Sequence, residues 1–104
     1  MSISEKTIER HGAKVAKQHG LWALKLGMLG GRGWPDHTIL GHGGRIAFIE
    51  YKVPGGAFQP LQKLMHRRLR KLGFTVVVID SKQGVDEFFR DWIGHEANKK
   101  EQEV

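Results

Sequence analysis

Hydrophobic positions along the chain switch between helical and strand spacing, and this pattern predicts a mixed α/β domain. Ser4 is suited to cap a first helix, and Gly20 is suited to end it. Three apolar runs then predict strands at residues 21–26, 37–40 and 45–52. Four consecutive turn-type positions, 41–44, separate the second run from the third and predict a hairpin. The third run is the most apolar, so we expect it to lie in the middle of the sheet.

The second half of the chain predicts a helix, a strand and a last helix. Residues 58–72 place leucines at helical spacing among basic residues, and Gly73 ends this segment. The run 74–79 is continuously apolar, which predicts a strand buried on both faces and parallel to the third strand. A last helix should begin near Ser81 and end near Ile93.

We therefore expect an α/β fold in the order α-β-β-β-α-β with a C-terminal helix, built as a mixed sheet flanked by helices. The length of 104 residues predicts a single folded domain. We assign it to residues 1–94 and expect 95–104 to form a polar C-terminal tail.

The composition of the chain limits the kinds of partner that we expect for it. Seventeen Lys and Arg against eleven Asp and Glu give a net charge of +6, which suits a polyanion such as DNA. The chain has no cysteine, so disulfides and thiolate zinc sites are excluded. No apolar run reaches the ~20 residues of a membrane span, so we expect no membrane partner and a cytoplasmic location.

Two carboxylates and a lysine occupy positions that strand geometry can bring together. Asp36 begins the second predicted strand, and Glu50 and Lys52 end the third. Side chains alternate along a strand, so Glu50 and Lys52 should share a face while Tyr51 points to the other. Counting outward from the hairpin turn places Asp36 near Glu50. Two adjacent carboxylates need a cation or a proton, and a hard cation such as Mg²⁺ beside a lysine suits cleavage of a phosphodiester.

The runs that carry this chemistry are Gly33-Trp34-Pro35-Asp36 and Glu50-Tyr51-Lys52. They resemble the motif of the PD-(D/E)xK nuclease superfamily. Further segments resemble its VRR-NUC branch: Lys25, the glycine-rich 30–33, Phe48-Ile49, Leu61-Gln62 and the run 72–81. The resemblance extends from about Glu5 to Ser81. It implies a restriction-endonuclease-like core and the activity of a metal-dependent DNA endonuclease. The resemblance is to the small, standalone type that phages often encode. If a phage encodes this protein, its location would be the host cytoplasm.

The resemblance also implies site roles. Asp36, Glu50 and the backbone carbonyl of Tyr51 would hold Mg²⁺ or Mn²⁺, and no organic cofactor is expected. A glutamate of the first helix would reach the metal, directly or through water; Glu9 stands at about the family spacing, with Glu5 one turn earlier as the alternative. The set of expected catalytic residues is Glu9, Asp36, Glu50, Lys52 and Gln62.

Basic and aromatic residues near these positions are candidates for contacts with DNA: Lys25, Arg32, Trp34, His37, Arg67 and Arg68. His37 stands where the family often has arginine. Packing under the loop is an equally good interpretation of Trp34, and a solvated helix face is an equally good interpretation of the arginines. His66 lies among the arginines and is expected to belong to the same basic face.

The resemblance suggests structure-directed cutting of branched DNA, including Holliday junctions, by a homodimer. Phe88, Phe89 and Trp92 are candidates for a dimer surface, although at least two of them are expected to pack against the sheet. Two other functions stay open. One is a basic DNA-binding module without catalysis. The other is an HNH-type nicking nuclease that uses His37 with His95 and Asn98.

Overall fold

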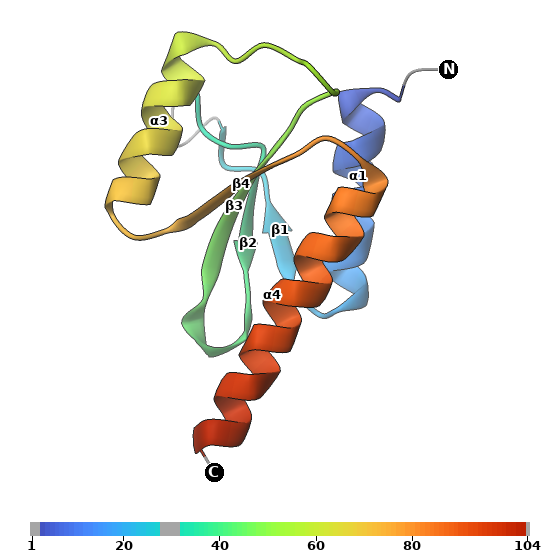
Figure 1. The fold of residues 1–104 in the computed structure, drawn as a ribbon, viewed down its shortest axis with the longest axis vertical. Helices are drawn as coiled ribbons and strands as arrows, with labels where there is room; N and C mark the ends of the chain where they lie inside the picture. Colours follow the sequence, from blue (N-terminus) through green and yellow to red (C-terminus); the bar gives the residue numbers. More distant parts are fainter. Residues whose placement is uncertain (1–2, 28–31, 104) are drawn as a thin grey trace.

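The protein is described by a computed structural model that covers residues 3–27 and 32–103, with side chains described as far as Gly94 (Figure 1). The elements follow one another as α1 (Glu5–Gln18), β1 (Trp22–Leu24), β2 (His37–Leu40), the short 3₁₀ turn η1 (His42–Gly44), β3 (Ile46–Tyr51), α3 (Pro60–Lys71), β4 (Thr75–Ile79) and α4 (Lys82–Glu103). This order of helices and strands confirms the predicted α/β fold class.

The four described strands form one mixed sheet in the order β1-β2-β3-β4. β1 pairs with β2 and β2 with β3 in antiparallel fashion, while β3 and β4 are parallel across the α3 crossover. The apolar β3 is internal, as predicted. Since β2 and β3 form a tight hairpin, their register controls which side chains meet at its open end.

Alternation along β3 divides the interior into two layers. Ala47, Ile49 and Tyr51 point into a core shared with α1 and α4, whereas Phe48 points into a smaller cluster with Leu69 and Val76 on the α3 side. Figure 1 shows α3 on one side of the sheet and α1 beside α4 on the other. Glu50 follows Phe48 by two residues and therefore faces α3.

The first helix begins as the sequence predicts. The Ser4 hydroxyl accepts a hydrogen bond from the Thr7 N–H at 3.1 Å, and the helix stops before Gly20, whose φ of +72° is the left-handed conformation that favours glycine. A glycine within the helix has a different purpose. Gly12 is buried, and a Cβ at this position would lie 2.1 Å from the hydroxyl oxygen of Tyr51. Close packing of α1 on Tyr51 therefore depends on Gly12.

Gly12→Ala is expected to destabilise the protein by about 1–2 kcal/mol, because the clash with Tyr51 outweighs the helix propensity of alanine. Gly94→Ala is the matched control: it is also in a helix, but nothing lies within 4 Å of the added Cβ. It should be neutral or stabilising by up to ~1 kcal/mol. Urea unfolding of both variants measures the difference, and equal stabilities would contradict the packing role of Gly12.

Two predictions about the second half of the chain need correction. β4 is an edge strand in the described sheet and is not buried along its whole length, because Thr75 is exposed and Val78 is 41% exposed. α4 continues to Glu103 instead of ending near Ile93, consistent with the strong helix propensity of the lysines, glutamates and alanine that follow. The side chains of 95–104 lie outside those described.

Aromatic residues of α4 pack inward, as expected for at least two of the three. Phe89 and Trp92 are buried against the sheet, and Phe88 is partly buried and stacks on Trp92. The aromatic set thus belongs mainly to the core. None of the helices in the described part of the chain combines the length and apolar content that a membrane span needs.

Candidate active site

The β2–β3 register brings the two motif carboxylates together. His37 pairs with Ile49, so the next step outward places Asp36 opposite Glu50. The Asp36 backbone N–H donates to Glu50 Oε2 at 3.1 Å, and the Tyr51 N–H donates to Asp36 Oδ2 at 2.8 Å. Each carboxylate is therefore held by a backbone N–H of the other segment, and these hydrogen bonds keep the two carboxylates close together.

Glu50 is almost fully buried, at 3% exposure. The Gln62 amide donates to Glu50 Oε1 at 2.7 Å, and Gln62 Oε1 accepts from the Gln59 N–H at 2.9 Å. Gln62 therefore connects the first turn of α3 to the buried carboxylate. Burial, with a further contribution from the negative charge of Asp36, raises the pKa of Glu50 to about 7.

Asp36 lies on the side of the site that is formed by α1. It lines a cavity of ≈ 320 Å³ together with Glu5, Lys6 and Glu9 of α1. Burial raises the pKa of Asp36 above its usual value despite the hydrogen bond from Tyr51; Glu9 and then Glu5 add to the rise, while Lys52 opposes it. Both helix glutamates thus act on the site electrostatically, and Glu9 acts on Asp36 more strongly than Glu5 does.

Lys52 lies one residue beyond the end of β3. Its backbone N–H donates to the Ile79 carbonyl at 3.1 Å, and its Nζ lies 5.2 Å from the centroid of the Phe58 ring. Its positive charge lowers the pKa of both Asp36 and Glu50, against the larger effect of burial. The lysine is therefore within electrostatic reach of both carboxylates.

This donor set fits a hard divalent cation. The two carboxylates are close together, their pKa values are raised by burial and by acidic neighbours, and one lysine opposes that excess of negative charge. Magnesium requires few carboxylates because waters and phosphate oxygens complete its octahedron. Among the described residues, no group of three or more His, Cys, Asp or Glu side chains could hold a metal ion without further ligands. A cation at Asp36 and Glu50 would need other oxygen ligands as well.

His37 is not available to DNA, contrary to the prediction. It is 3% exposed, its Nδ1 lies 2.9 Å from the Tyr51 hydroxyl, and its Nε2 lies 4.0 Å from Glu9 Oε1. Burial lowers the pKa of His37, although Glu9 opposes this, and burial raises the pKa of Tyr51. His37 therefore contacts Tyr51 and Glu9 in the protein interior next to the site. An HNH-type role is disfavoured by this contact with Tyr51; the side chains of His95 and Asn98 lie outside the described set.

Trp34 and Lys25 also have partners within the protein. The Trp34 ring packs edge-on against Phe48, and its Nε1–H donates to Thr38 at 3.3 Å. Packing is thus the better interpretation of Trp34 than a wedge between bases. Lys25 Nζ lies 3.4 Å from Glu9 Oε1 and remains mostly exposed, so it can hold the helix glutamate and still meet a phosphate.

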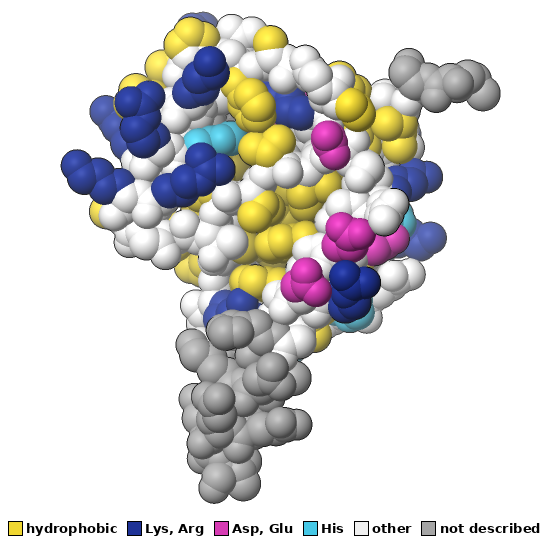
Figure 2. Space-filling view, viewed as in Figure 1, with side chains coloured by type: hydrophobic (Ala, Val, Ile, Leu, Met, Phe, Trp, Pro, Cys, Tyr) yellow, Lys and Arg dark blue, Asp and Glu magenta, His cyan; other side chains and the backbone are white. Residues whose placement is uncertain are grey.

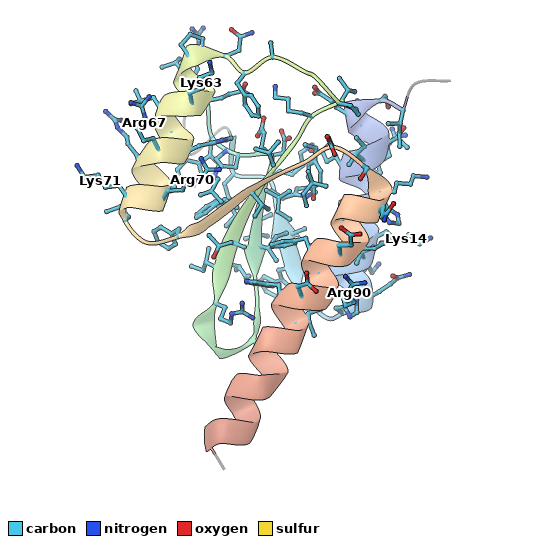
Figure 3. All side chains as sticks on the ribbon, in the orientation of Figure 1. Lys14, Lys63, Arg67, Arg70, Lys71 and Arg90 are labelled. Atoms are coloured by element: carbon cyan, nitrogen blue, oxygen red, sulfur yellow. The ribbon has the colours of Figure 1, made fainter. Side chains whose placement is uncertain are left out.

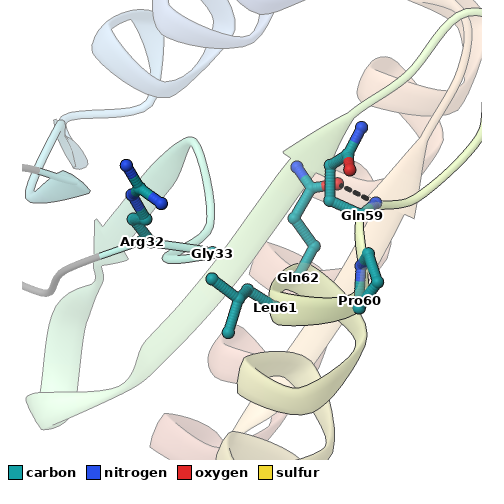
Figure 4. A pocket seen from close by; sticks show the side chains of 6 residues that line it. All are labelled: Arg32, Gly33, Gln59, Pro60, Leu61 and Gln62. Carbon is teal, nitrogen blue, oxygen red and sulfur yellow. Dashed lines mark hydrogen bonds between the residues drawn. The ribbon is translucent and has the colours of Figure 1, made fainter.

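Arg32 and Gly33 face the first turn of α3 across a cavity of ≈ 430 Å³ lined by Arg32, Gly33, Gln59, Pro60, Leu61 and Gln62 (Figure 4). Gly33 has a φ of +84°, and a Cβ there would lie 2.4 Å from the Leu61 carbonyl oxygen. Only glycine permits this approach between the motif loop and α3. Sequence reasoning missed the contact, because two segments far apart in the chain create it.

The basic residues of α3 are all exposed, as predicted for a basic face: Lys63, Arg67, Arg68, Arg70 and Lys71. Three of them, Lys63, Arg67 and Arg70, also line a cavity beside β4. His66 is not a member of the exposed face, because only 3% of it is accessible. Sequence position could have indicated this: His66 precedes the buried Leu69 by three residues and so lies on the same side of the helix.

Comparison with known proteins found relatives of this chain in sequence and in structure. Putative nuclease p44 of Acyrthosiphon pisum secondary endosymbiont phage 1 is 39% identical over 79 residues, which are 76% of this chain and 85% of that protein. A solved structure described as a VRR_NUC domain has a TM-score of 0.76 at 27% identity and covers 85% of this chain and 97% of its own. No family model matches the chain.

The fold is that of a nuclease domain. The chain belongs to the VRR-NUC family, which confirms the resemblance seen in the sequence. It is therefore related to enzymes that act on nucleic acid.

Proposed function

We propose that the protein is a divalent-metal-dependent endonuclease that hydrolyses phosphodiester bonds in DNA, with Asp36, Glu50 and Lys52 at the reacting phosphate. The observation that carries the proposal is the carboxylate pair itself. Two acids with raised pKa values lie side by side within electrostatic reach of a lysine, an arrangement that is costly for folding and useful for holding a cation. The excess of basic residues supports a polyanionic substrate.

Each residue has a distinct role in this mechanism. Asp36 and Glu50 would hold Mg²⁺ or Mn²⁺ with the Tyr51 carbonyl, and Glu9 would contribute through water, with Glu5 as its alternative. When bound, the cation supplies positive charge that stabilises the phosphate in the transition state. Gln62 orients Glu50 through its 2.7 Å hydrogen bond and holds a water or a phosphate oxygen once that bond is exchanged.

Lys52 acts on the substrate directly. Its ammonium group orients the attacking water and neutralises the charge that accumulates on the phosphate oxygens. The water oxygen forms a bond to phosphorus and gives up one proton to solvent. The bond between phosphorus and the leaving deoxyribose oxygen breaks, and that oxygen takes up a proton from solvent. Lys25 and Arg32, on either side of the site, would hold neighbouring phosphates.

Cleavage of supercoiled plasmid tests this function. Wild-type protein should nick or linearise the plasmid with Mg²⁺ or Mn²⁺ and should leave it intact with EDTA, because the paired carboxylates cannot position a phosphate without a cation between them. Binding of DNA with no cutting at any metal concentration would favour the alternative function, a DNA-binding module without catalysis.

We further propose that the substrate is branched DNA and that the active form is a homodimer. A domain of this size offers little surface for reading a base sequence, and two symmetric sites would make paired incisions across a junction. Cleavage of a four-way junction should exceed cleavage of a flap, a splayed duplex and a plain duplex, and the solution mass should correspond to two chains. Equal cutting of all four substrates by a monomer would overturn this part of the proposal.

A further inference from the structure

A third cavity, which is basic, lies between α3 and the exposed end of β4. Its volume is ≈ 330 Å³, and it is lined by Phe58, Lys63, His66, Arg67, Arg70 and Val78. Figure 2 shows a histidine surrounded by Lys and Arg side chains on this face, and Figure 3 shows Lys63, Arg67 and Arg70 following one another along α3. None of the described residues that line the cavity is acidic, so the charge that they contribute is of one sign.

His66 is the unusual member of the cavity wall. It is 3% exposed, and within the described part of the structure its Nε2 is the one buried side-chain nitrogen or oxygen that lacks a hydrogen-bond partner. A buried polar atom without a partner costs about 1–3 kcal/mol. A ligand that accepts a hydrogen bond from this nitrogen would recover that energy.

The cations around His66 are free to bind an anion. Lys63 and Arg67 are exposed and make no ion pair with an acid among the described residues. Arg70 is held at the rim, because its Nη2 donates to the Val76 carbonyl at 3.2 Å. Arginine guanidinium groups and a lysine that converge on a cavity with a neutral donor at its base form a suitable cradle for a tetrahedral oxyanion.

The cavity is a neighbour of the active site. Val78, in its wall, pairs in register with Glu50 across the parallel strands. The Phe58 ring centroid is 5.9 Å from that of His66 and 5.2 Å from Lys52 Nζ, so one aromatic ring separates the cavity from the proposed catalytic lysine. A nucleic acid strand that crosses the active site can therefore place a second phosphate here.

We propose that Lys63, His66, Arg67 and Arg70 form a phosphate-binding pocket that holds a phosphate of the nucleic acid adjacent to the one being cut. The identification of the ligand as nucleic acid rests on the proposed function; the preference of the pocket for phosphate does not. The phosphate is either an internal diester or a terminal monoester of the substrate, and both present the oxygens that the pocket requires.

The first test observes the buried histidine directly. Inorganic phosphate added to the ¹⁵N-labelled protein in EDTA should shift the His66 Nε2 resonance in a saturable way. The shift should be lost in the double variant Lys63→Gln/Arg67→Gln and retained in Arg68→Gln/Lys71→Gln, which removes the same charge from residues of α3 that do not line the cavity. If phosphate leaves His66 unmoved while shifting other residues, the pocket assignment is wrong and the histidine has another partner, such as water.

The second test measures DNA binding in EDTA, where no cleavage occurs. Lys63→Gln/Arg67→Gln should raise the Kd for a duplex about 10-fold and lower the slope of log K against log salt by about 1, whereas Arg68→Gln/Lys71→Gln should have a smaller effect. Circular dichroism checks that both variants fold. Equal losses in the two variants would show a diffuse basic face and would overturn the proposal.

Two duplexes identify the source of the phosphate. If a 5′-phosphorylated end binds more tightly than a 5′-hydroxyl end, and the pocket variant removes that difference, the pocket holds a terminal monoester. If both ends bind alike and the pocket variant weakens both, it holds an internal diester. Since all of these measurements are made without metal, they stand even if plasmid cleavage fails, and a failed pocket leaves the cleavage result intact.

Discussion

Glu50→Gln should reduce DNA cleavage by on the order of 10²–10³-fold or more while leaving the protein folded. The substitution keeps the size of the side chain and removes the charge that would hold the cation. The Asp36 N–H and the Gln62 amide approach the two oxygens of Glu50, so the surrounding geometry should be largely preserved. Single-turnover cleavage of plasmid at saturating protein concentration measures the loss in the chemical step.

Asp36→Asn and Lys52→Met should give losses of similar size, because each removes a charge at the reacting phosphate. Glu87→Gln is the matched control. Glu87 is exposed on α4, where it contacts only Gln83 among the hydrogen bonds of the described residues, and its removal should leave the rate unchanged. Cleavage by Glu50→Gln at the wild-type rate would place the chemistry elsewhere on the chain.

The Glu50→Gln variant should also be more stable than the wild type at pH 8 in EDTA. The pKa of Glu50 is raised from 4.5 to about 7 in the folded protein, so between these values the folded state holds a proton that the unfolded chain has released. The free energy of unfolding then falls as pH rises through this window, by roughly 3 kcal/mol in total. Asp36, whose pKa is also raised, adds to the fall. Glutamine at position 50 cannot ionise and removes the Glu50 part of this pH dependence.

The substitution also has a cost. Glu50 accepts hydrogen bonds from the Asp36 N–H and the Gln62 amide, and a glutamine at position 50 has only one oxygen to accept them. Gln62 could instead accept a hydrogen bond from the new amide only by giving up its bond to the Gln59 N–H. One hydrogen bond is therefore lost in either case, at a cost of about 1 kcal/mol. We therefore expect Glu50→Gln to be stabilised by about 2 kcal/mol at pH 8 and destabilised by about 1 kcal/mol near pH 4.5, so the two stability curves should cross.

Urea unfolding across pH 4.5–8 measures this crossing, with Glu87→Gln as the control that should follow the wild type. Addition of Mg²⁺ at pH 8 should stabilise the wild type, since a cation that binds only the folded state raises the free energy of unfolding, and should affect Glu50→Gln much less. Parallel curves for wild type and variant at all pH values would mean that Glu50 is not the strained group that its surroundings indicate.

The positions of Asp36 and Glu50 could be predicted because the relevant contacts are local in the chain. A glycine turn joins two short strands, and the side-chain period of two then determines which residues face each other. The same reasoning failed for β4. An apolar run looks alike whether its faces are fully or only partly covered, and the coverage depends on which elements pack against it.

Histidines were the least predictable part of the site. His37 and His66 both stand next to charged residues in the sequence, which favoured exposed roles, yet each has only 3% of its surface accessible. Their burial depends on neighbours distant in the chain: Tyr51 and Glu9 for His37, and Phe58 and Val78 for His66. The pattern of residues along a single segment cannot predict contacts of this kind.

The sequence by itself determined the succession of helices and strands, the carboxylate–lysine motif and the surplus of positive charge, because spacing and composition are local properties that a reader can count. Only the tertiary structure decided that α1 needs Gly12 to approach Tyr51, that Gln62 reaches Glu50, and that Lys63, His66, Arg67 and Arg70 surround a cavity beside the site. The physical reason is that burial, and the pKa shifts that follow from it, depend on which elements pack against each other rather than on the order in which they occur.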